Sequence, residues 1–276
     1  MYTLNCKGRL LVLEKPAVMG ILNVTPDSFY SGSRTQAADA ILQKAGQMLH
    51  DGAAILDIGG QSTRPGSSRI SEAEELERVV PAIQLIKQTF PDSFISIDTY
   101  YSGVAKLAVE AGADIVNDVT GGEADAAMLP TVAALQVPFI TMHMQGTLDT
   151  MQHNPFYNNV TAEVLDALMR KTEQCKQAGI ADVVIDPGFG FGKTISHNFQ
   201  LLRELEVFQL IKQPLLVGIS RKSTIYKTLG VSANEALNGT TVLHTIALQK
   251  GAAILRVHDV KEAVEAVTLV QSVFNK

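Results

Sequence analysis

The segment His50–Gly60, HDGAAILDIGG, decides the fold, because the same arrangement recurs at three other places along the chain. The other copies read EAGADIVNDV (Glu110–Val119), QAGIADVVIDPG (Gln177–Gly188) and QKGAAILRVHD (Gln249–Asp259). In each copy a helical stretch stops at a glycine, and a short run of branched apolar residues follows. A run this apolar cannot face water, so each copy predicts a strand buried on both faces of a parallel sheet.

Such apolar runs occur eight times, with amphipathic helical stretches between most of them. Eight strand–helix units in about 250 residues are typical of a (βα)8 TIM barrel, an α/β fold, and an open doubly wound sheet is the alternative. No linker or change of composition divides the chain, so we predict a single domain, residues 1–276. The predicted strands are Val18–Asn23, Ile55–Gly59, Phe94–Asp98, Ile115–Asn117, Phe139–His143, Val183–Asp186, Leu215–Ser220 and Ile254–His258, and the clearest helices are Ala37–His50, Glu72–Gln88 and Val160–Gln177.

The composition excludes several classes of protein. Hydrophobic residues make up 46% of the chain, which suits a large buried core, and the net charge of −5 argues against nucleic acid as a partner. No apolar run approaches the roughly 20 residues that a membrane helix needs, so no membrane partner is expected. Charges at Lys7 and Arg9 interrupt any signal-peptide stretch, and Cys6 and Cys175 form no metal motif. We therefore predict a soluble cytoplasmic protein.

Polar side chains end nearly every predicted strand, which is where a barrel of this kind builds its active site. Because strand side chains alternate, Arg256 and His258 point the same way, as do Ser96 and Asp98. A single aspartate after a strand is usually a helix cap, and His143 could equally be a core histidine, but the whole set predicts a functional site. Its members are Asn23, Asp57, Asp98, Asn117, His143, Asp186, Ser220 with Arg221 and Lys222, and Arg256 with His258.

The stretch VVIDPGFGFGKT, Val183–Thr194, looks like a nucleotide-binding loop but fails both tests for one. A phosphate-binding P-loop needs a glycine five positions before Gly192, where Pro187 stands, and the dinucleotide spacing of glycines is also absent. The alternating glycines instead allow the backbone to approach a flat ligand, with Phe189 and Phe191 available as walls. Lys193, which lies past these glycines, is predicted to be solvated.

Eight motifs then follow one another in order along the chain. Together they resemble the dihydropteroate synthase family, whose fold is the TIM barrel, in agreement with the repeated unit. The resemblance covers essentially the full length. The motifs are MGILNVTPDSF (Met19–Phe29), GGQSTRPG (Gly59–Gly66), SIDT (Ser96–Thr99), NDVTGG (Asn117–Gly122), MHMQGT (Met142–Thr147), DPGFGFGKT (Asp186–Thr194), GISRKS (Gly218–Ser223) and RVHDV (Arg256–Val260).

The resemblance implies that 6-hydroxymethyl-7,8-dihydropterin diphosphate condenses with 4-aminobenzoate, with Mg²⁺ assisting, to give 7,8-dihydropteroate and diphosphate. It also implies a homodimer formed through the later helices. Asn23 is then the magnesium-associated residue, and Lys222, Arg256, His258 and Asp98 are the catalytic ones. The residues implied to bind the pterin are Asp98, Asn117, Asp186 and Lys222, and those implied to bind the diphosphate are Thr63, Arg256 and His258. The residues implied to shape the aminobenzoate site are Ser220, Thr63, Pro65, Phe191, Phe29 and Arg64. Met142 and Gly218 are further implied substrate-binding residues.

The chemistry of these side chains suits the implied reaction. A carboxylate such as Asp186 can accept the adjacent N–H donors of an aminopyrimidine, and the amide of Asn117 can both donate and accept. Arg256 offers a planar fork of donors to a diphosphate, and His258 adds another on the same face. We expect a loose, cation-like transition state in which Asp98 helps to stabilise positive charge on the pterin methylene. An ordinary lysine at the start of a helix is the other interpretation of Lys222.

Two departures from the family pattern fall in the first two loops. Gln61 stands where the family usually has Glu, and Phe29–Arg34 lacks the usual Asp-Gly turn. These loops, 25–34 and 61–69, are expected to close over the aminobenzoate.

Two rival interpretations remain. A pterin-binding methyltransferase domain has no diphosphate to hold and does not need Arg256 with His258, and a non-catalytic paralogue would lack a strand-end group, whereas none is missing.

Overall fold

The computed structural model describes residues 1–24, 34–61 and 69–274 of the chain. Within these residues, eight parallel strands make up one sheet, and an antiparallel pair of strands makes up a second. The strands of the large sheet are β3 (Ala17–Asn23), β4 (Ile55–Gly59), β5 (Phe94–Asp98), β6 (Ile115–Asp118), β7 (Phe139–Met142), β8 (Val183–Asp186), β9 (Leu216–Val217) and β10 (Ile254–Val257).

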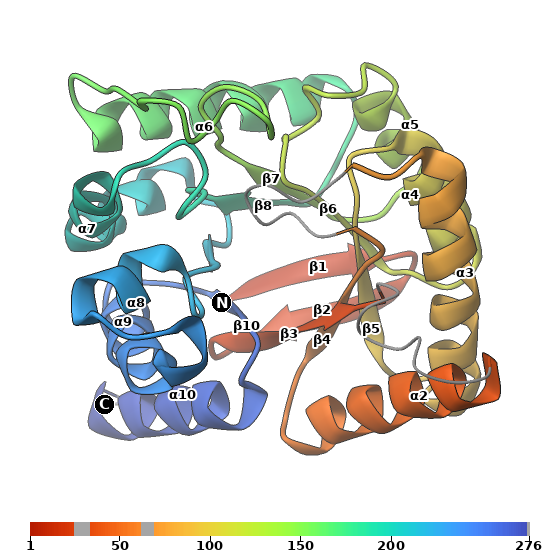
Figure 1. The fold of residues 1–276 in the computed structure, drawn as a ribbon. Coiled ribbons are helices and arrows are strands. Elements are labelled where there is room, and N and C mark those ends of the chain that lie inside the picture. Colours follow the sequence, from red (N-terminus) through yellow and green to blue (C-terminus); the bar gives the residue numbers. More distant parts are fainter. Residues whose placement is uncertain (25–33, 62–68, 275–276) are drawn as a thin grey trace.

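The large sheet closes on itself. Its strand order is β8-β7-β6-β5-β4-β3-β10-β9, and a parallel bridge between Ile185 and Leu215 joins the two outer strands. The predicted (βα)8 barrel is therefore confirmed, and the open doubly wound sheet is excluded, because that sheet would leave two separate edges. Figure 1 shows the helices as a ring around the strands.

The helices match the clearest predictions to within a few residues. The predicted helices Ala37–His50, Glu72–Gln88 and Val160–Gln177 correspond to α2 (Arg34–His50), α3 (Glu72–Thr89) and α6 (Val160–Gln177). In α3 a capping box of Ser71 and Glu74 fixes the first turn. No helix in the described part of the chain is long and apolar enough to cross a membrane. The helices are α2 (Arg34–His50), α3 (Glu72–Thr89), α4 (Ser102–Glu110), α5 (Met128–Leu135), α6 (Val160–Gln177), α7 (Ile195–Arg203), α8 (Ser223–Leu229), α9 (Leu237–Gln249) and α10 (Val260–Phe274), with 3-10 turns η1 (Leu205–Ile211) and η2 (Ala233–Glu235).

An N-terminal hairpin, β1 (Tyr2–Cys6) and β2 (Arg9–Leu13), covers one end of the barrel and was not predicted from the sequence. The backbone N–H of Asn5 donates to Asp182, just before β8, at 2.8 Å. Arg9 donates to the carbonyl oxygen of Asp92, before β5, at 2.6 Å. Both contacts lie at the amino ends of the strands, so the hairpin leaves the carboxyl ends uncovered.

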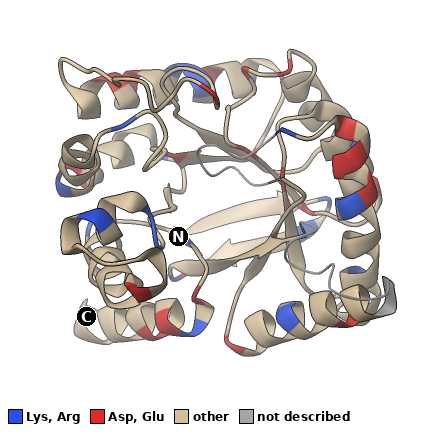
Figure 2. Cartoon of the chain, in the orientation of Figure 1, with Lys and Arg blue, Asp and Glu red and all other residues tan. Residues whose placement is uncertain are grey.

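Alternation along the strands divides the core into two layers. One set of strand residues, including Leu56 and Ile58, packs with the helices. The other set packs with the hairpin and comprises Ala17, Met19, Ile55, Ile115, Ile140, Val184, Leu216 and Ile254. Two positions after four of these inner residues, on the same face, come Asp57, Asn117, Asp186 and Arg256. The inner face of the barrel therefore changes from apolar to polar toward the carboxyl ends. Figure 2 shows most other charged residues on the outer helices and loops.

Candidate active site

A buried ion-pair network lies at the centre of the strand ends. Nε of Arg256 donates to Oδ2 of Asp57 at 2.6 Å, and Nη2 donates to Oδ2 of Asp98 at 2.6 Å. Asp57 is fully buried, and Nδ2 of Asn117 lies 3.3 and 3.4 Å from its two carboxylate oxygens. Four predicted site residues, from β4, β5, β6 and β10, are thus brought together.

The electrostatics of this network follow from its burial. Burial raises the pKa of Asp98, and the guanidinium of Arg256 acts against this effect. Burial lowers the pKa of Arg256, but Asp57 and Asp98 outweigh it and leave that pKa above its ordinary value. The arrangement is therefore one permanent cation between two carboxylates. Sequence reasoning had placed Asp57 in the site without a role, and the structure makes it a partner of Arg256.

Asp186 and Lys222 form a second polar group beside the network. Oδ1 of Asp186 accepts the backbone N–H of Gly188 at 2.7 Å. A Cβ atom at Gly218 would lie 3.8 Å from Oδ2 of Asp186 and 3.9 Å from both Nζ of Lys222 and Cβ of Arg256. Gly218 therefore leaves open space where these three side chains meet.

Lys222 is directed into the site. Its Nζ donates to the carbonyl oxygen of Phe189 and lies 4.6 Å from the centre of the Phe191 ring. Although Lys222 occupies the N-cap position of α8, its side chain makes no capping hydrogen bond there. Burial lowers the pKa of Lys222 to about 8, with the charge of Asp186 opposing that shift. An ordinary solvated lysine at a helix start does not describe this residue.

Asn23 and Asp98 lie on either side of Gly59. The strand register pairs Asn23 with Gly59 and Gly59 with Asp98. A Cβ atom at Gly59 would lie 3.6 Å from Oδ1 of Asn23 and 3.7 Å from Oδ2 of Asp98. The absence of a side chain at this position allows the amide and the carboxylate to share one level of the barrel.

Ser220 and His258 connect the ends of the last two strands. Oγ of Ser220 lies 3.1 Å from Nδ1 of His258 and accepts the backbone N–H of His258 at 3.2 Å. The residues that follow them in the chain, Arg221 and Asp259, form an ion pair in which Nε of Arg221 lies 2.7 Å from Oδ2 of Asp259. Arg221 itself has a left-handed backbone with φ of 52°, so the chain turns here and β9 is shorter than the predicted strand Leu215–Ser220.

An apolar wall stands next to these polar groups. Met142 and Phe191, two predicted binding residues, pack in one cluster with Tyr100, Val119 and Met151. The hydroxyl of Tyr100 donates to Oε1 of Gln61 at 3.0 Å, which connects this wall to the start of the second loop. Tyr100 and Met151 were not predicted from the sequence, because Tyr100 lies two residues beyond the end of β5 and Met151 lies between β7 and α6.

The prediction that Lys193 is solvated is wrong. Its side chain is buried, and Nζ lies 2.9 Å from Nδ1 of His143 and 3.0 Å from the carbonyl oxygens of Gly188 and Phe191. Burial lowers the pKa of Lys193 to about 7, and burial together with Lys193 lowers that of His143 to about 2. His143 is therefore a neutral, buried partner of Lys193 and faces the loop after β8.

Four predicted residues, Phe29, Thr63, Arg64 and Pro65, lie outside the described residues.

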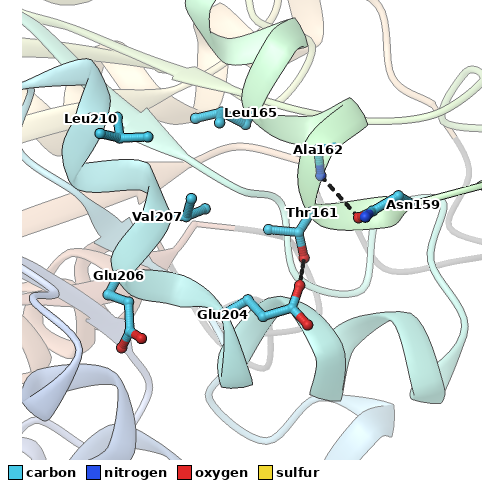
Figure 3. Close-up of a pocket in the computed structure, with 8 residues that line it drawn as sticks. All are labelled: Asn159, Thr161, Ala162, Leu165, Glu204, Glu206, Val207 and Leu210. Carbon is cyan, nitrogen blue, oxygen red and sulfur yellow. Dashed lines mark hydrogen bonds between the residues drawn. The ribbon is translucent and has the colours of Figure 1, made fainter.

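A surface groove of about 570 Å³ lies apart from the strand ends, between α6 and η1. Figure 3 shows its apolar side, with Leu165, Val207 and Leu210, and the hydrogen bond from Thr161 to Glu204 at 2.6 Å. No predicted site residue lines this groove.

Comparison with known proteins identifies close relatives. The model of a family described as pterin binding enzyme matches residues 19–258. A dihydropteroate synthase of Escherichia coli K12 is 45% identical over 268 residues, which cover 96% of this chain and 94% of the relative. A Yersinia pestis dihydropteroate synthase crystallised with a sulfonamide drug complex matches all of both chains with a TM-score of 0.93 and 42% identity. A Xanthomonas albilineans dihydropteroate synthase in complex with 7,8-dihydropteroate matches all of both chains with a TM-score of 0.88 and 37% identity.

Proposed function

This chain belongs to the family of pterin binding enzymes, and from that premise we propose that it condenses 6-hydroxymethyl-7,8-dihydropterin diphosphate with 4-aminobenzoate. The products are 7,8-dihydropteroate and diphosphate, so the enzyme is a transferase that forms a C–N bond. The observation that carries the proposal is the buried cluster of Asp57, Asp98, Asn117 and Arg256 beside Asp186 and Lys222. The proposal is also supported by the relatives, which are dihydropteroate synthases, and one of them was crystallised in complex with 7,8-dihydropteroate.

Asp186 and Asn117 are proposed to bind the aminopyrimidine edge of the pterin. That edge presents adjacent N–H donors, which a carboxylate accepts well. Asp186 uses Oδ1 for the N–H of Gly188, which fixes the carboxylate and leaves Oδ2 facing the space at Gly218. The amide of Asn117 faces Asp57 through its nitrogen, so its oxygen is the atom suited to accept from the ligand. Lys222 supplies a donor for the acceptor atoms of the ring.

The balance of charge favours cleavage of the C–O bond before the amine attacks. Three carboxyl groups, Asp57, Asp98 and Asp186, lie with Arg256 and Lys222. When the bond breaks, its electron pair leaves with the diphosphate and the pterin methylene becomes positive, and a neighbouring carboxylate such as Asp98 stabilises that charge. The amine nitrogen of 4-aminobenzoate then bonds to the methylene and releases a proton. The proposed transition state is therefore loose and cation-like.

Arg256 and His258 are proposed to receive the leaving diphosphate. Two nitrogens of Arg256 already bind carboxylates, so its contact with the diphosphate would use Nη1. Oγ of Ser220 accepts the backbone N–H of His258, and its own hydrogen can therefore go to Nδ1 of the ring. That hydrogen bond leaves the ring proton on Nε2, where it can be donated to a phosphate oxygen.

Mg²⁺ is proposed to be held by Asn23, with the diphosphate providing most of the other oxygen ligands. The amide oxygen of Asn23 is a hard donor on the same level as Asp98, which suits an ion that prefers oxygen. No group of three His, Cys, Asp or Glu residues in the described part of the chain could hold a metal. Protein side chains alone are thus too few, and binding is expected to depend on the diphosphate. When bound, the ion would supply positive charge to the departing oxygens.

A homodimer through the later helices and a cytoplasmic location complete the proposal. Exposed apolar side chains on three consecutive helices support the dimer: Leu229 on α8, Val242 on α9, and Leu269 and Val273 on α10. A contiguous apolar surface marks a protein–protein interface, and α9 contacts both α8 and α10. Both cysteines are buried and form no disulfide, in line with a reducing compartment.

Turnover with pterin diphosphate, labelled 4-aminobenzoate and Mg²⁺ tests the proposal. We expect dihydropteroate and diphosphate to appear in equal amounts, and a chelator to abolish both. A sulfonamide, the type of ligand in the Yersinia pestis complex, is expected to compete with 4-aminobenzoate. Pterin binding without either product would contradict the proposed activity and favour the non-catalytic paralogue.

A further inference from the structure

Lys193 carries a buried amino group that the proposed reaction does not use. Its side chain is 4% exposed, and its Nζ has four neighbours: Nδ1 of His143 at 2.9 Å, the carbonyl oxygen of His143 at 3.3 Å, and the carbonyl oxygens of Gly188 and Phe191 at 3.0 Å. An ammonium group has only three hydrogens, so these neighbours satisfy it completely. Among the described residues, no carboxylate forms an ion pair with Lys193.

A lysine in such a place is costly for stability. Removing an ammonium from water has a penalty of several kcal/mol, which neutral acceptors only partly offset. An apolar side chain would fill the same space without that penalty. The four acceptors also come from two separate segments, the end of β7 and the loop after β8. A structural role limited to filling space does not account for an amino group that donates hydrogen bonds to both segments.

The loop after β8, residues 187–192, is held at every carbonyl group from Gly188 to Gly192. Gln152 donates to Gly190 at 2.8 Å, the hydroxyl of Tyr157 donates to Gly192 at 2.8 Å, and Lys222 donates to Phe189. Lys193 holds the remaining two, Gly188 and Phe191. Gly188 has a φ of 72°, and a Cβ atom there would overlap the carbonyl oxygen of His143, so the loop lies directly against the end of β7.

The two carbonyl groups held by Lys193 belong to residues that adjoin the substrate site. Gly188 donates its N–H to Oδ1 of Asp186 at 2.7 Å, so fixing the Gly188 backbone fixes the carboxylate proposed to bind the pterin. Phe191 carries the ring that lies 4.6 Å below Nζ of Lys222 and forms part of the apolar wall. One ammonium group therefore sets the backbone at both a pterin-binding and an aminobenzoate-binding position.

We infer that Lys193 is a positioning residue, which clamps the loop after β8 against His143 and thereby sets the positions of Asp186 and Phe191 for substrate binding. The inference rests on the proposed function for its kinetic consequences. Lys193 touches no substrate in this scheme. It acts through the backbone of Gly188 and Phe191, and its loss displaces both binding groups together.

Lys193→Met tests the inference, because methionine has a similar length but no donors. We expect the Kd for the pterin diphosphate, measured by calorimetry, and the KM for 4-aminobenzoate each to rise by about 10- to 100-fold, as displacement of binding groups by up to 1 Å would cause. Hydrogen exchange measured by mass spectrometry should become faster in peptides that span residues 186–192. Lys193→Arg keeps the charge but has a planar fork of donors, and it should raise the same two constants.

Tyr157→Phe is the matched control, because it removes one buried hydrogen bond to the same loop, at the carbonyl oxygen of Gly192 rather than at Gly188 or Phe191. It should lower the Tm without changing the Kd or the KM. Wild-type constants in Lys193→Met would overturn the positioning role, and so would faster exchange with unchanged constants. Absence of dihydropteroate formation by the wild-type enzyme would contradict the proposed function instead, and pterin affinity and exchange would still decide the role of Lys193.

Discussion

Asp57 and Arg256 are 199 positions apart in the chain, yet Oδ2 of Asp57 lies 2.6 Å from Nε of Arg256. The pair joins β4 to β10 across β3, which lies between them in the sheet. Asp57 is fully buried and the side chain of Arg256 is 16% exposed, and Asp98 on β5 shares the same guanidinium. A single side chain therefore connects three strand ends, and we expect its loss to affect both stability and catalysis.

Arg256→Ala should reduce both the activity and the free energy of unfolding. Two carboxylates would remain buried without a counter-charge, which costs about 3–5 kcal/mol of stability. The loss of a preorganised charge at the site should lower kcat/KM by the equivalent of about 2–4 kcal/mol. Urea denaturation and steady-state kinetics measure the two effects. Wild-type kcat/KM in this variant would end the proposed role of Arg256 in binding diphosphate.

The double variant Arg256→Ala with Asp57→Asn separates the two effects. Neutralising Asp57 removes one of the unpaired charges, so part of the lost stability should return. Activity should not return, because the guanidinium is still missing. Recovery of kcat/KM together with stability would mean that Arg256 acts only in holding the barrel together.

Asp186→Asn should weaken pterin binding without unfolding the protein. The amide oxygen of asparagine can still accept the N–H of Gly188, which keeps the loop in place. Its NH₂ group would then face the N–H donors of the pterin, so the Kd should rise by about 10- to 100-fold, the equivalent of about 1.4–2.8 kcal/mol. Calorimetry measures the change. Asp182→Asn, which affects the hairpin contact before β8, is the control and should leave the Kd unchanged.

Gly218→Ala should impair binding while leaving stability unchanged. The added methyl group would lie 3.8 Å from Oδ2 of Asp186 and 3.9 Å from the nearest atoms of Lys222 and Arg256, an ordinary van der Waals distance. The protein therefore has room for it, but the pterin would meet it. We expect an unchanged Tm and a pterin Kd at least about 10-fold higher, because an extra methyl group displaces a rigid ligand. A wild-type Kd would show that the pterin does not enter this space.

The sequence predicted the strands and the strand-end residues well, because both follow from local patterns. Buried branched runs mark parallel strands, and alternation places Asp57, Asn117, Asp186 and Arg256 on the inner face. Which charges pair could not be predicted, because Asp57 meets Arg256 only when the barrel closes. The hairpin was missed because its strands are short and half exposed, and its role depends on contacts such as the one to Asp182.

Lys193 was placed wrongly for a similar reason. A lysine after a glycine-rich loop is usually solvated, and its burial depends on the loop folding back onto His143.

The length of β9 also depended on tertiary structure. Its apolar run continues to Ile219, but the turn at Arg221, held by the ion pair with Asp259, ends the strand early.

Glu75 on α3 gives the stability of this protein a dependence on pH. Its side chain is 1% exposed, and one oxygen accepts from the hydroxyl of Thr99 at 3.2 Å. The other oxygen, Oε1, has no hydrogen-bond partner among the residues that the structure describes. Burial, followed by the charge of Asp98, raises the pKa of Glu75 from 4.5 to about 8. The folded protein therefore holds a proton on Glu75 at neutral pH, where the unfolded chain has released it.

Glu75→Gln should stabilise the protein increasingly as the pH rises. Between its ordinary pKa and about 8, the folded state binds one more proton than the unfolded state, so the free energy of unfolding of the wild type falls with pH. Glutamine removes this contribution, which amounts to at most about 1.4 kcal/mol per pH unit. Urea denaturation at about pH 5 and about pH 8 measures the difference. The gain should be larger at the higher pH, and the exposed Glu77→Gln serves as the control. An equal effect at both values would mean that Glu75 is ionised in the folded state.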